Sequence, residues 1–117
     1  MKIIKTLVPL LLLFSTSSNA ILTLEYYSKY KHSTDPAVKN TLFNYLSGVN
    51  GTMLVMNETF FVRTNIHLYC QPKNLALNTT QLFSIIDEFL EYKPQHDKKT
   101  PIEFVAIEAL EYTFPCN

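Results

Sequence analysis

Two cysteines, Cys70 and Cys116, have the clearest potential chemistry in this chain. In an oxidising compartment they can form a disulfide, and two cysteines allow only one intramolecular pairing. On the chain-entropy model, closing a loop of this length stabilises a small domain by about 4 kcal/mol at most. Two free thiols are the alternative. A zinc site is less favoured, because the cysteines lie far apart in the chain and His67 is the only histidine near them.

The sequence contains no recognisable catalytic motif. It has no nucleophile elbow, no HExxH, no P-loop and no dinucleotide fingerprint. His32, His67 and His96 are scattered over predicted loops and an extended segment, so we interpret each as a solvated surface histidine. Oxidised cysteines would also exclude a Cys/His nucleophile. We therefore predict a protein that is not an enzyme and that needs neither a metal nor a cofactor.

Three segments match the N-glycosylation sequon: Asn50-Gly51-Thr52, Asn57-Glu58-Thr59 and Asn78-Thr79-Thr80. In a small eukaryotic secreted glycoprotein they would mark the surface. In a bacterial protein the same residues would serve only in turns and helix caps.

Residues 1–20 have the layout of a secretory signal peptide. Lys2 and Lys5 form a positively charged start, residues 7–14 are a short apolar run, and Ser18-Asn19-Ala20 fits a signal peptidase site. The apolar run is too short to cross about 30 Å of hydrocarbon as a helix. We predict that this segment is cleaved after export, with a buried N-terminal helix as the alternative.

The rest of the chain, residues 21–117, is enough for one small domain. It carries eight basic and ten acidic side chains, which gives a net charge of −2. This balance offers no electrostatic basis for binding nucleic acid or an anionic membrane, and we expect neither partner for the mature form.

Apolar residues at helical spacing predict the first two helices of this domain. The first covers residues 22–32. The second covers residues 36 to about 57, because Asp35 suits an N-cap and Pro36 suits the first helical position. Its apolar face consists of Val38, Leu42, Tyr45, Leu46, Val49, Met53 and Met56.

Gly48 and Gly51 lie inside the second predicted helix, where each costs about 1 kcal/mol relative to alanine. Small residues on one side could let another helix approach closely; the alternative is a helix that breaks near Gly51. Residues 60–70 then alternate with a period of two. This pattern predicts an extended segment or short strand, although no partner strand is evident.

Two more helices close the chain. Asn78 or Thr79 caps the third, which ends near Tyr92. Thr100-Pro101-Ile102-Glu103 matches a capping box with proline at the first helical position, and it starts a fourth helix that ends near Phe114. These elements predict an all-α fold, a single small domain of about four helices with one disulfide that closes the last two helices into a hairpin.

Several short segments share an order and spacing with a known family. They are Tyr69-Cys70-Gln71-Pro72, Thr80-Gln81-Leu82, Phe89-Leu90 with Pro94, Ala109-Leu110 and Phe114-Pro115-Cys116, preceded by Tyr45-Leu46-Ser47-Gly48-Val49. With the signal peptide, they resemble the Rap/Tai-type immunity protein family, the periplasmic immunity proteins against type VI secretion amidase effectors. The resemblance covers residues 45–116. Many members have a second cysteine pair joining the first two helices. This chain has Tyr27 and Leu42 there, so packing must replace that crosslink.

The resemblance implies a periplasmic immunity protein that binds a peptidoglycan amidase effector, occludes its cleft, and acts as a homodimer. We expect the loop between the last two helices to contribute to partner contact, because a polar loop on a rigid scaffold binds at low entropic cost. An ordinary solvated loop is the alternative. The candidate partner-binding residues are Tyr92, Lys93, Gln95, His96, Asp97, Lys98 and Lys99.

An acid-activated periplasmic chaperone is the rival functional interpretation. Such a protein binds unfolded clients after its carboxylates and histidines are protonated. A chaperone should lose its fold near about pH 2–3 and then protect unrelated proteins from aggregation. An immunity protein should stay inert there and bind one enzyme in a fixed ratio.

Overall fold

The computed structural model describes residues 21–117, so the predicted signal peptide at 1–20 lies outside the described residues. The helices in this part of the chain are α2 (Leu24–Tyr30), α3 (Pro36–Thr64), α4 (Thr79–Tyr92) and α5 (Ile102–Thr113). Within residues 21–117 the only β feature is an isolated bridge between Thr23 and Pro101. The predicted all-α fold with about four helices and one disulfide is confirmed.

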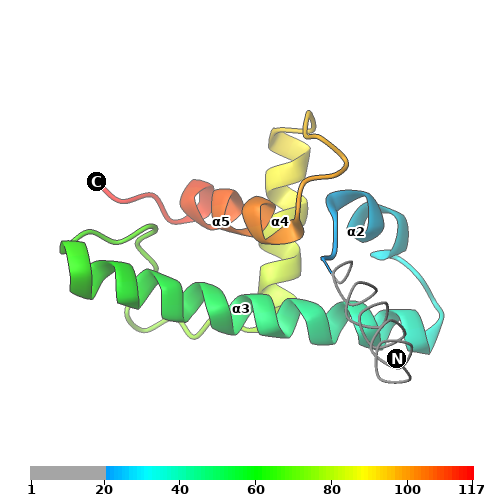
Figure 1. Cartoon of the computed structure of the whole chain (residues 1–117), viewed down its shortest axis with the longest axis horizontal. Coiled ribbons are helices and arrows are strands. Elements are labelled where there is room, and N and C mark those ends of the chain that lie inside the picture. The colour runs from blue at the N-terminus through cyan, green and yellow to red at the C-terminus, as the bar shows by residue number, and fades with distance from the viewer. Residues whose placement is uncertain (1–20) are drawn as a thin grey trace, which may run out of the picture.

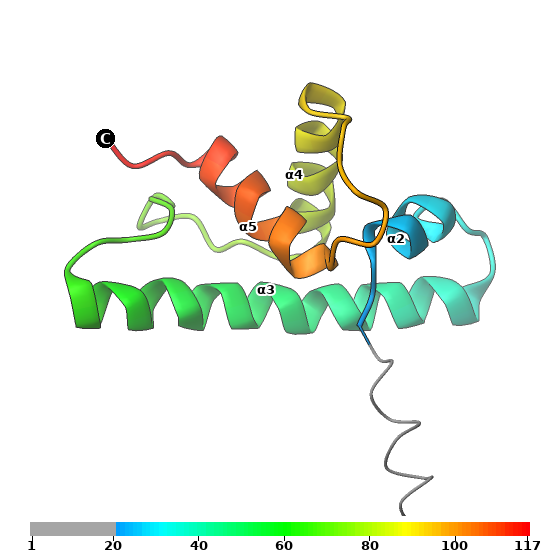
Figure 2. The same ribbon diagram turned by 45° about the horizontal axis from the view of Figure 1, so that its top comes forward.

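The helices form two layers. One layer is α3, a long straight rod, and the other contains α2, α4 and α5, which all lie on the same side of that rod (Figure 2). The helix α2 lies beside the first part of α3, and α5 extends toward the end where α3 finishes (Figure 1). The core lies between the layers. Its buried residues are Leu22, Leu24, Tyr27, Leu42, Leu46, Val49, Met53, Tyr69, Leu82, Ile85, Ile86, Phe89, Ile102, Val105, Ala106, Ala109 and Leu110.

Local capping explains two of the helix starts. The Asp35 carboxylate accepts a hydrogen bond from the Ala37 amide at 3.0 Å, and Pro36 occupies the first helical position. At α4, Asn78 and Gln81 form a reciprocal capping box, each side chain accepting from the other's backbone amide. Asp35 and Asn78 therefore act as the sequence predicts.

The predicted extended segment at residues 60–70 is wrong over its first half. The helix α3 continues to Thr64 and ends where Asn65 adopts a left-handed conformation with φ of 61°. The alternating pattern led to a wrong prediction of extended chain because α3 is apolar on more than one side. Phe60 and Val62 belong to the helix although they are 38% and 82% exposed. Only the end of the segment is irregular chain, and it leads to Cys70.

Neither interpretation of the two glycines is correct. The helix α3 runs unbroken through Gly48 and Gly51, and a methyl group at either position would meet nothing within 4 Å. No helix among residues 21–117 approaches closely there.

The predicted capping box at Thr100 is also wrong. Pro101 is the N-cap of α5 and no side chain caps this end. The Thr100 amide, which a capping box would pair with Glu103, donates instead to the Asp97 carbonyl at 3.0 Å, and the Glu103 carboxylate accepts from the Tyr45 hydroxyl. The local pairing is absent because Asp97 and Tyr45 take its two partners.

Packing joins Tyr27 and Leu42, the two positions where the sequence leads us to expect packing in place of a crosslink. Tyr27 is fully buried and Leu42 is 2% exposed, and both belong to the same core. The Tyr27 hydroxyl donates to Asp87 Oδ1 on α4 at 2.7 Å, and Lys31 Nζ lies 3.3 Å from the same oxygen. These contacts hold α2 against α4.

Candidate functional site

The predicted partner-binding residues lie at one end of the molecule, where the chain leaves α4 and passes α2 on its way to α5 (Figure 1). We call residues 93–99 the cationic loop, because they carry three lysines and one aspartate. Its lysines, Lys93, Lys98 and Lys99, are all exposed. Residues 21–117 have a net charge of −2, so this loop is locally opposite in sign to the whole.

The cationic loop is held in place by backbone hydrogen bonds. The Glu25 amide on α2 donates to the Lys98 carbonyl at 3.0 Å. Asp97 closes a turn within the loop, because its carboxylate accepts from the Lys99 amide at 2.9 Å and its carbonyl accepts from the Thr100 amide at 3.0 Å. A loop anchored in this way loses little conformational entropy when a partner binds.

Tyr92, the last residue of α4, adds an exposed aromatic surface beside this loop. Its side chain is 67% exposed and its ring stacks on Tyr112 of α5, with ring centroids 4.5 Å apart and an interplanar angle of 23°. Stacking fixes the ring while leaving one face in solvent. Fixed, exposed tyrosines are a common anchor in protein interfaces.

His96 is not the solvated surface histidine that the sequence suggests. Its side chain is only 8% exposed and packs edge-on against Phe89, with centroids 5.5 Å apart. Nε2 lies 3.5 Å from Glu108 Oε2 on α5, but neither ring nitrogen has a hydrogen-bond partner among residues 21–117. The loop folds over this ring, so burial depends on α4, α5 and the loop together.

His67 is also half-sheltered rather than free in solvent. Its ring stacks on Phe61 with centroids 4.0 Å apart and an interplanar angle of 7°. Its Nε2 lies 3.7 Å from Glu58 Oε1. His32 is exposed, as predicted.

The disulfide joins Cys70 and Cys116, as predicted, with Cα atoms 5.0 Å apart. Beside it the Cys70 amide donates to the Phe114 carbonyl at 2.8 Å. We call this pair of links the clasp. It fastens the chain that follows α3 to the end of α5, and both cysteines are exposed.

A hollow lies behind the clasp, and no pattern in the sequence indicated it. This α3 groove has a volume of about 680 Å³ and runs between the last turns of α3 and residues 67–75. Its lining is mostly apolar, with Leu54, Phe61, Tyr69, Pro72 and Leu75, and polar groups come from Asn57, Glu58, His67, Gln71 and Lys73. The predicted extended segment at residues 60–70 left no place for this groove. One wall of the groove is formed by the last turns of α3, which occupy the first half of that segment.

Asn57 builds the floor of the α3 groove. It is 4% exposed, and its side-chain oxygen accepts from the Leu68 and Tyr69 amides at 2.8 and 3.3 Å. Its amide group donates to the Tyr69 carbonyl at 3.0 Å. One buried side chain thus replaces the strand partner that this segment lacks. The burial also leaves the Asn57 amide no access for a glycan.

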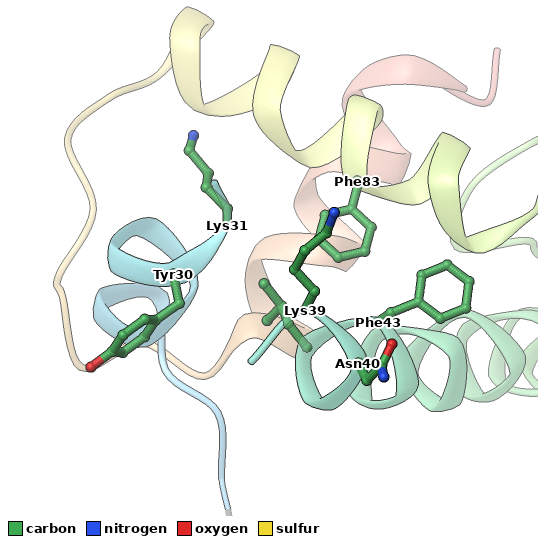
Figure 3. A pocket seen from close by; sticks show the side chains of 7 residues that line it. Tyr30, Lys31, Lys39, Asn40, Phe43 and Phe83 are labelled. Atoms are coloured by element: carbon green, nitrogen blue, oxygen red, sulfur yellow. The ribbon is translucent and has the colours of Figure 1, made fainter. Parts of the chain in front are cut away.

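A smaller hollow of about 260 Å³ lies where α2, α3 and α4 meet (Figure 3). Phe43 and Phe83 line it, and Lys39 reaches toward Phe83 (Figure 3). Lys31 pairs with Asp87 instead, and the Tyr30 hydroxyl points away from the hollow (Figure 3). Few polar groups converge there, so it lacks the features of a specific small-molecule site.

Three tyrosine hydroxyls are held protonated by their surroundings. Burial raises the pKa of Tyr27 far above its ordinary value, and its hydrogen bond to Asp87 raises it further. Burial also raises the pKa of Tyr45 and of Tyr69, with Glu103 adding to the first effect and Glu58 to the second. These phenols serve as hydrogen-bond donors or core groups rather than as bases.

Over residues 21–117 no group of three or more His, Cys, Asp or Glu side chains is placed to hold a metal ion. No helix in that part of the chain is long and apolar enough to cross a membrane.

The structure thus brings the predicted loop residues together at one end, with six of the seven exposed and His96 buried beneath them. Comparison of the chain with models of known protein families, with curated proteins and with solved structures finds no match.

Proposed function

We propose that this chain is a periplasmic immunity protein that binds a peptidoglycan amidase effector of type VI secretion and occludes its cleft. The observation that carries the proposal is the cationic loop with Tyr92: an exposed surface that is already ordered before any partner arrives. A backbone hydrogen bond from Glu25 of α2 to Lys98, a second from Leu24 to the adjoining Thr100, and the Tyr92–Tyr112 stack fix it. Ordered loops on a scaffold are suited to inserting into an enzyme cleft.

The segments that resemble the Rap/Tai-type family support the same proposal. Tyr69-Cys70-Gln71-Pro72 and Phe114-Pro115-Cys116 meet in space at the clasp. Phe89, Ala109 and Leu110 pack in the core between α4 and α5. Residues shared with the family therefore lie where they support the hairpin that carries the cationic loop.

The experiment is an inhibition assay with residues 21–117 and a purified peptidoglycan amidase effector of type VI secretion. We expect one copy of the chain per amidase to stop cleavage of purified peptidoglycan. A variant with Tyr92→Ala and Lys98→Ala should weaken binding by at least about tenfold, because it removes an interface anchor and a charge.

The matched control carries Lys39→Ala, an exposed lysine at the opposite end of the α3 rod from the clasp. It should inhibit like the unaltered chain. Full inhibition by the Tyr92 and Lys98 variant would remove the loop from the interface. No inhibition by the unaltered chain would refute the proposed function itself.

We include a homodimer in the proposal, with the second copy covering the far half of α3. Exposed apolar residues gather there: Leu54, Val55, Met56, Phe60 and Val62, with Ile66 just beyond the helix. Val55 and Val62 are seven residues apart and share one face, the spacing of a helix–helix seam. Apolar patches of this kind are characteristic of association surfaces.

Light scattering coupled to gel filtration tests the dimer. The unaltered chain should elute with twice the mass of one chain. Val62→Asp should yield monomers, because the aspartates of the two copies would be buried close to each other in the interface. Val62 is 82% exposed, so this change should leave the fold of the monomer intact. A dimer that survives Val62→Asp would place the interface elsewhere.

One observation favours the acid-activated chaperone as a second candidate. The Asp87 carboxylate holds α2 through both Tyr27 and Lys31. Loss of these two contacts would weaken the hold on α2 and on Phe83, which packs on Tyr27. A chaperone should suppress aggregation of unrelated proteins at about pH 3 but not at pH 7; failure to do so would eliminate this candidate.

A further inference from the structure

One exposed face of α5 carries aromatic and acidic side chains together. Phe104, Glu108 and Tyr112 follow one another at a spacing of four residues, so they lie along the same side of the helix. Phe104 is 61% exposed and Tyr112 is 43% exposed, as is the Glu108 side chain. Glu111 is exposed beside them, and Tyr92 of α4 stacks on the Tyr112 ring. We call these five residues the α5 stripe.

The tyrosine rings of the α5 stripe are fixed by their neighbours. Tyr112 packs against Phe89 with ring centroids 5.7 Å apart, and it stacks on Tyr92 with centroids 4.5 Å apart. Phe89 is 4% exposed and belongs to the core, so it anchors the pair. Rings that are ordered before binding lose little conformational entropy when a partner packs on them.

The two helices that carry the α5 stripe have charges of one sign. Neither α4 nor α5 contains a lysine or an arginine, and their acidic residues are Asp87, Glu88, Glu91, Glu103, Glu108 and Glu111. Glu108 lies 3.5 Å from His96 Nε2, and Glu111 has no ion-pair partner among residues 21–117. The cationic loop passes α4 on the side of α2, while α5 extends away on the other side (Figures 1 and 2). The two helices therefore present negative charge that they do not neutralise themselves.

The chemistry of the α5 stripe selects among possible contact surfaces. An apolar surface would take the carboxylates of Glu108 and Glu111 out of water without a partner, which is costly. An acidic surface would be repelled. A cation is attracted both by the carboxylates and by the negative faces of the aromatic rings. Arginine fits best, because its planar guanidinium stacks on rings and donates two parallel hydrogen bonds to one carboxylate.

We propose that the α5 stripe binds an arginine in a basic segment of the protein partner. The guanidinium stacks on the Tyr92–Tyr112 pair and donates to the Glu111 carboxylate. Glu108 adds a second negative charge, and Phe104 extends the apolar contact along α5. The inference rests on the proposed function only for the identity of that partner. It extends the partner surface from Tyr92 along α5, so the cationic loop and the α5 stripe contact regions of opposite charge.

A second copy of this chain is not the occupant that we assign to the α5 stripe. An isologous contact between two such stripes would bring like charges together. The chain has a single arginine, Arg63, near the end of α3. Arg63→Ala therefore tests whether a second copy covers the stripe, because that copy would have no arginine to insert.

The experiment is an NMR titration of residues 21–117 with a peptide of three arginines separated by glycines, with blocked ends. The signals of Tyr92, Glu111 and Tyr112 should shift together. A matched peptide with citrulline, which keeps the planar group without the charge, should not bind. A matched lysine peptide should bind at least about threefold more weakly, because it keeps the charge but cannot stack or donate two parallel hydrogen bonds.

Variants assign the binding to the α5 stripe. Glu111→Gln and Tyr112→Leu should each weaken binding of the arginine peptide by at least about threefold. Glu58→Gln is the matched control, because it removes the same charge from an exposed glutamate of α3, and it should bind the peptide as the unaltered chain does. Glu111 is exposed, so its variant folds even if Tyr112→Leu does not.

Several outcomes would overturn the inference: no binding of the arginine peptide, equal binding of the citrulline peptide, or unchanged affinity in Glu111→Gln. Binding that appears only in Arg63→Ala would also overturn it, because a second copy would then cover the stripe. The titration contains no amidase. Peptide binding without amidase inhibition would therefore refute the proposed function and support this inference, and inhibition without peptide binding would do the reverse.

Discussion

At the scale of single residues, tyrosine hydroxyls and one asparagine hold this small domain together. Tyr27 and Tyr45 each donate to a carboxylate on another helix, Asp87 and Glu103. Asn57 alone satisfies backbone groups of Leu68 and Tyr69. These bonds link distant parts of the chain, and their removal has consequences that can be measured.

Tyr27→Phe tests the buried phenol. Because the folded chain raises the pKa of Tyr27 above its ordinary value of 10.0, it keeps this proton where the unfolded chain loses it. The free energy of unfolding should therefore be largest below about pH 10 and fall as pH rises beyond that. In Tyr27→Phe the fall should be shallower, and the cost at pH 7 should be about 1–2 kcal/mol. Urea unfolding at several alkaline pH values measures both; equal slopes in the two proteins would contradict the assignment.

Asn57→Ala tests the floor of the α3 groove. The change leaves two amides and one carbonyl without their side-chain partner, so the free energy of unfolding should drop by at least about 2 kcal/mol. Asn50→Ala is the control, because Asn50 makes a single bond, to the Leu77 carbonyl at 2.9 Å. It should cost about 1 kcal/mol or less. Comparable losses in the two variants would show that Asn57 is not the organising group.

At the scale of elements, α3 differs from the other helices. It spans 29 residues, while α2, α4 and α5 span 7, 14 and 12, so one layer of short helices cannot cover it. Its uncovered far half carries the apolar residues that we assign to a second copy. Its middle carries two glycines that no neighbour among residues 21–117 explains.

Gly48→Ala and Gly51→Ala should each stabilise the chain, by about 0.5–1 kcal/mol. Alanine loses less backbone freedom on folding, and open space surrounds both positions. Thermal unfolding at low protein concentration measures the gain for the monomer. A loss of stability in either variant would mean that another surface, such as a second copy, packs closely on that face of α3.

At the scale of the whole molecule, the clasp closes residues 70–116 into one loop that contains α4, α5 and the cationic loop. The second layer is thereby fastened at its free end to the chain that leaves α3. The other end is fastened by α2, through Asp87 and the backbone bonds to the loop. A surface held from both ends can serve as a rigid binding platform.

Replacing both cysteines, Cys70→Ser with Cys116→Ser, should lower the free energy of unfolding by up to about 4 kcal/mol, because the unfolded chain gains freedom. Denaturant unfolding with and without dithiothreitol measures it. Reductant should destabilise the unaltered chain by the same amount and leave the double variant unchanged. An effect of reductant on the double variant would indicate a cause other than this disulfide.

Local signals predicted most of the fold. Asp35 with Pro36 and Asn78 with Gln81 set helix starts through bonds that span two or three residues, so neighbouring residues suffice to identify them. The candidate loop was also placed correctly, between two well-marked helices. The prediction failed at Thr100, where Tyr45 of α3 binds the Glu103 carboxylate, and in residues 60–70, where α3 continues to Thr64 and Asn57 binds the backbone that follows.

The sequence by itself determined the all-α class, the pairing of two cysteines and the place of the exposed loop. These follow from hydrophobic period, local caps and the count of cysteines, which are properties of short stretches of chain. Only the tertiary structure decided that α3 reaches Thr64, that His96 is buried against Glu108 and Phe89, and that a groove lies behind the clasp. Each of those features depends on residues brought together from different helices, and no local pattern encodes which distant group will compete for a backbone amide or cover a ring.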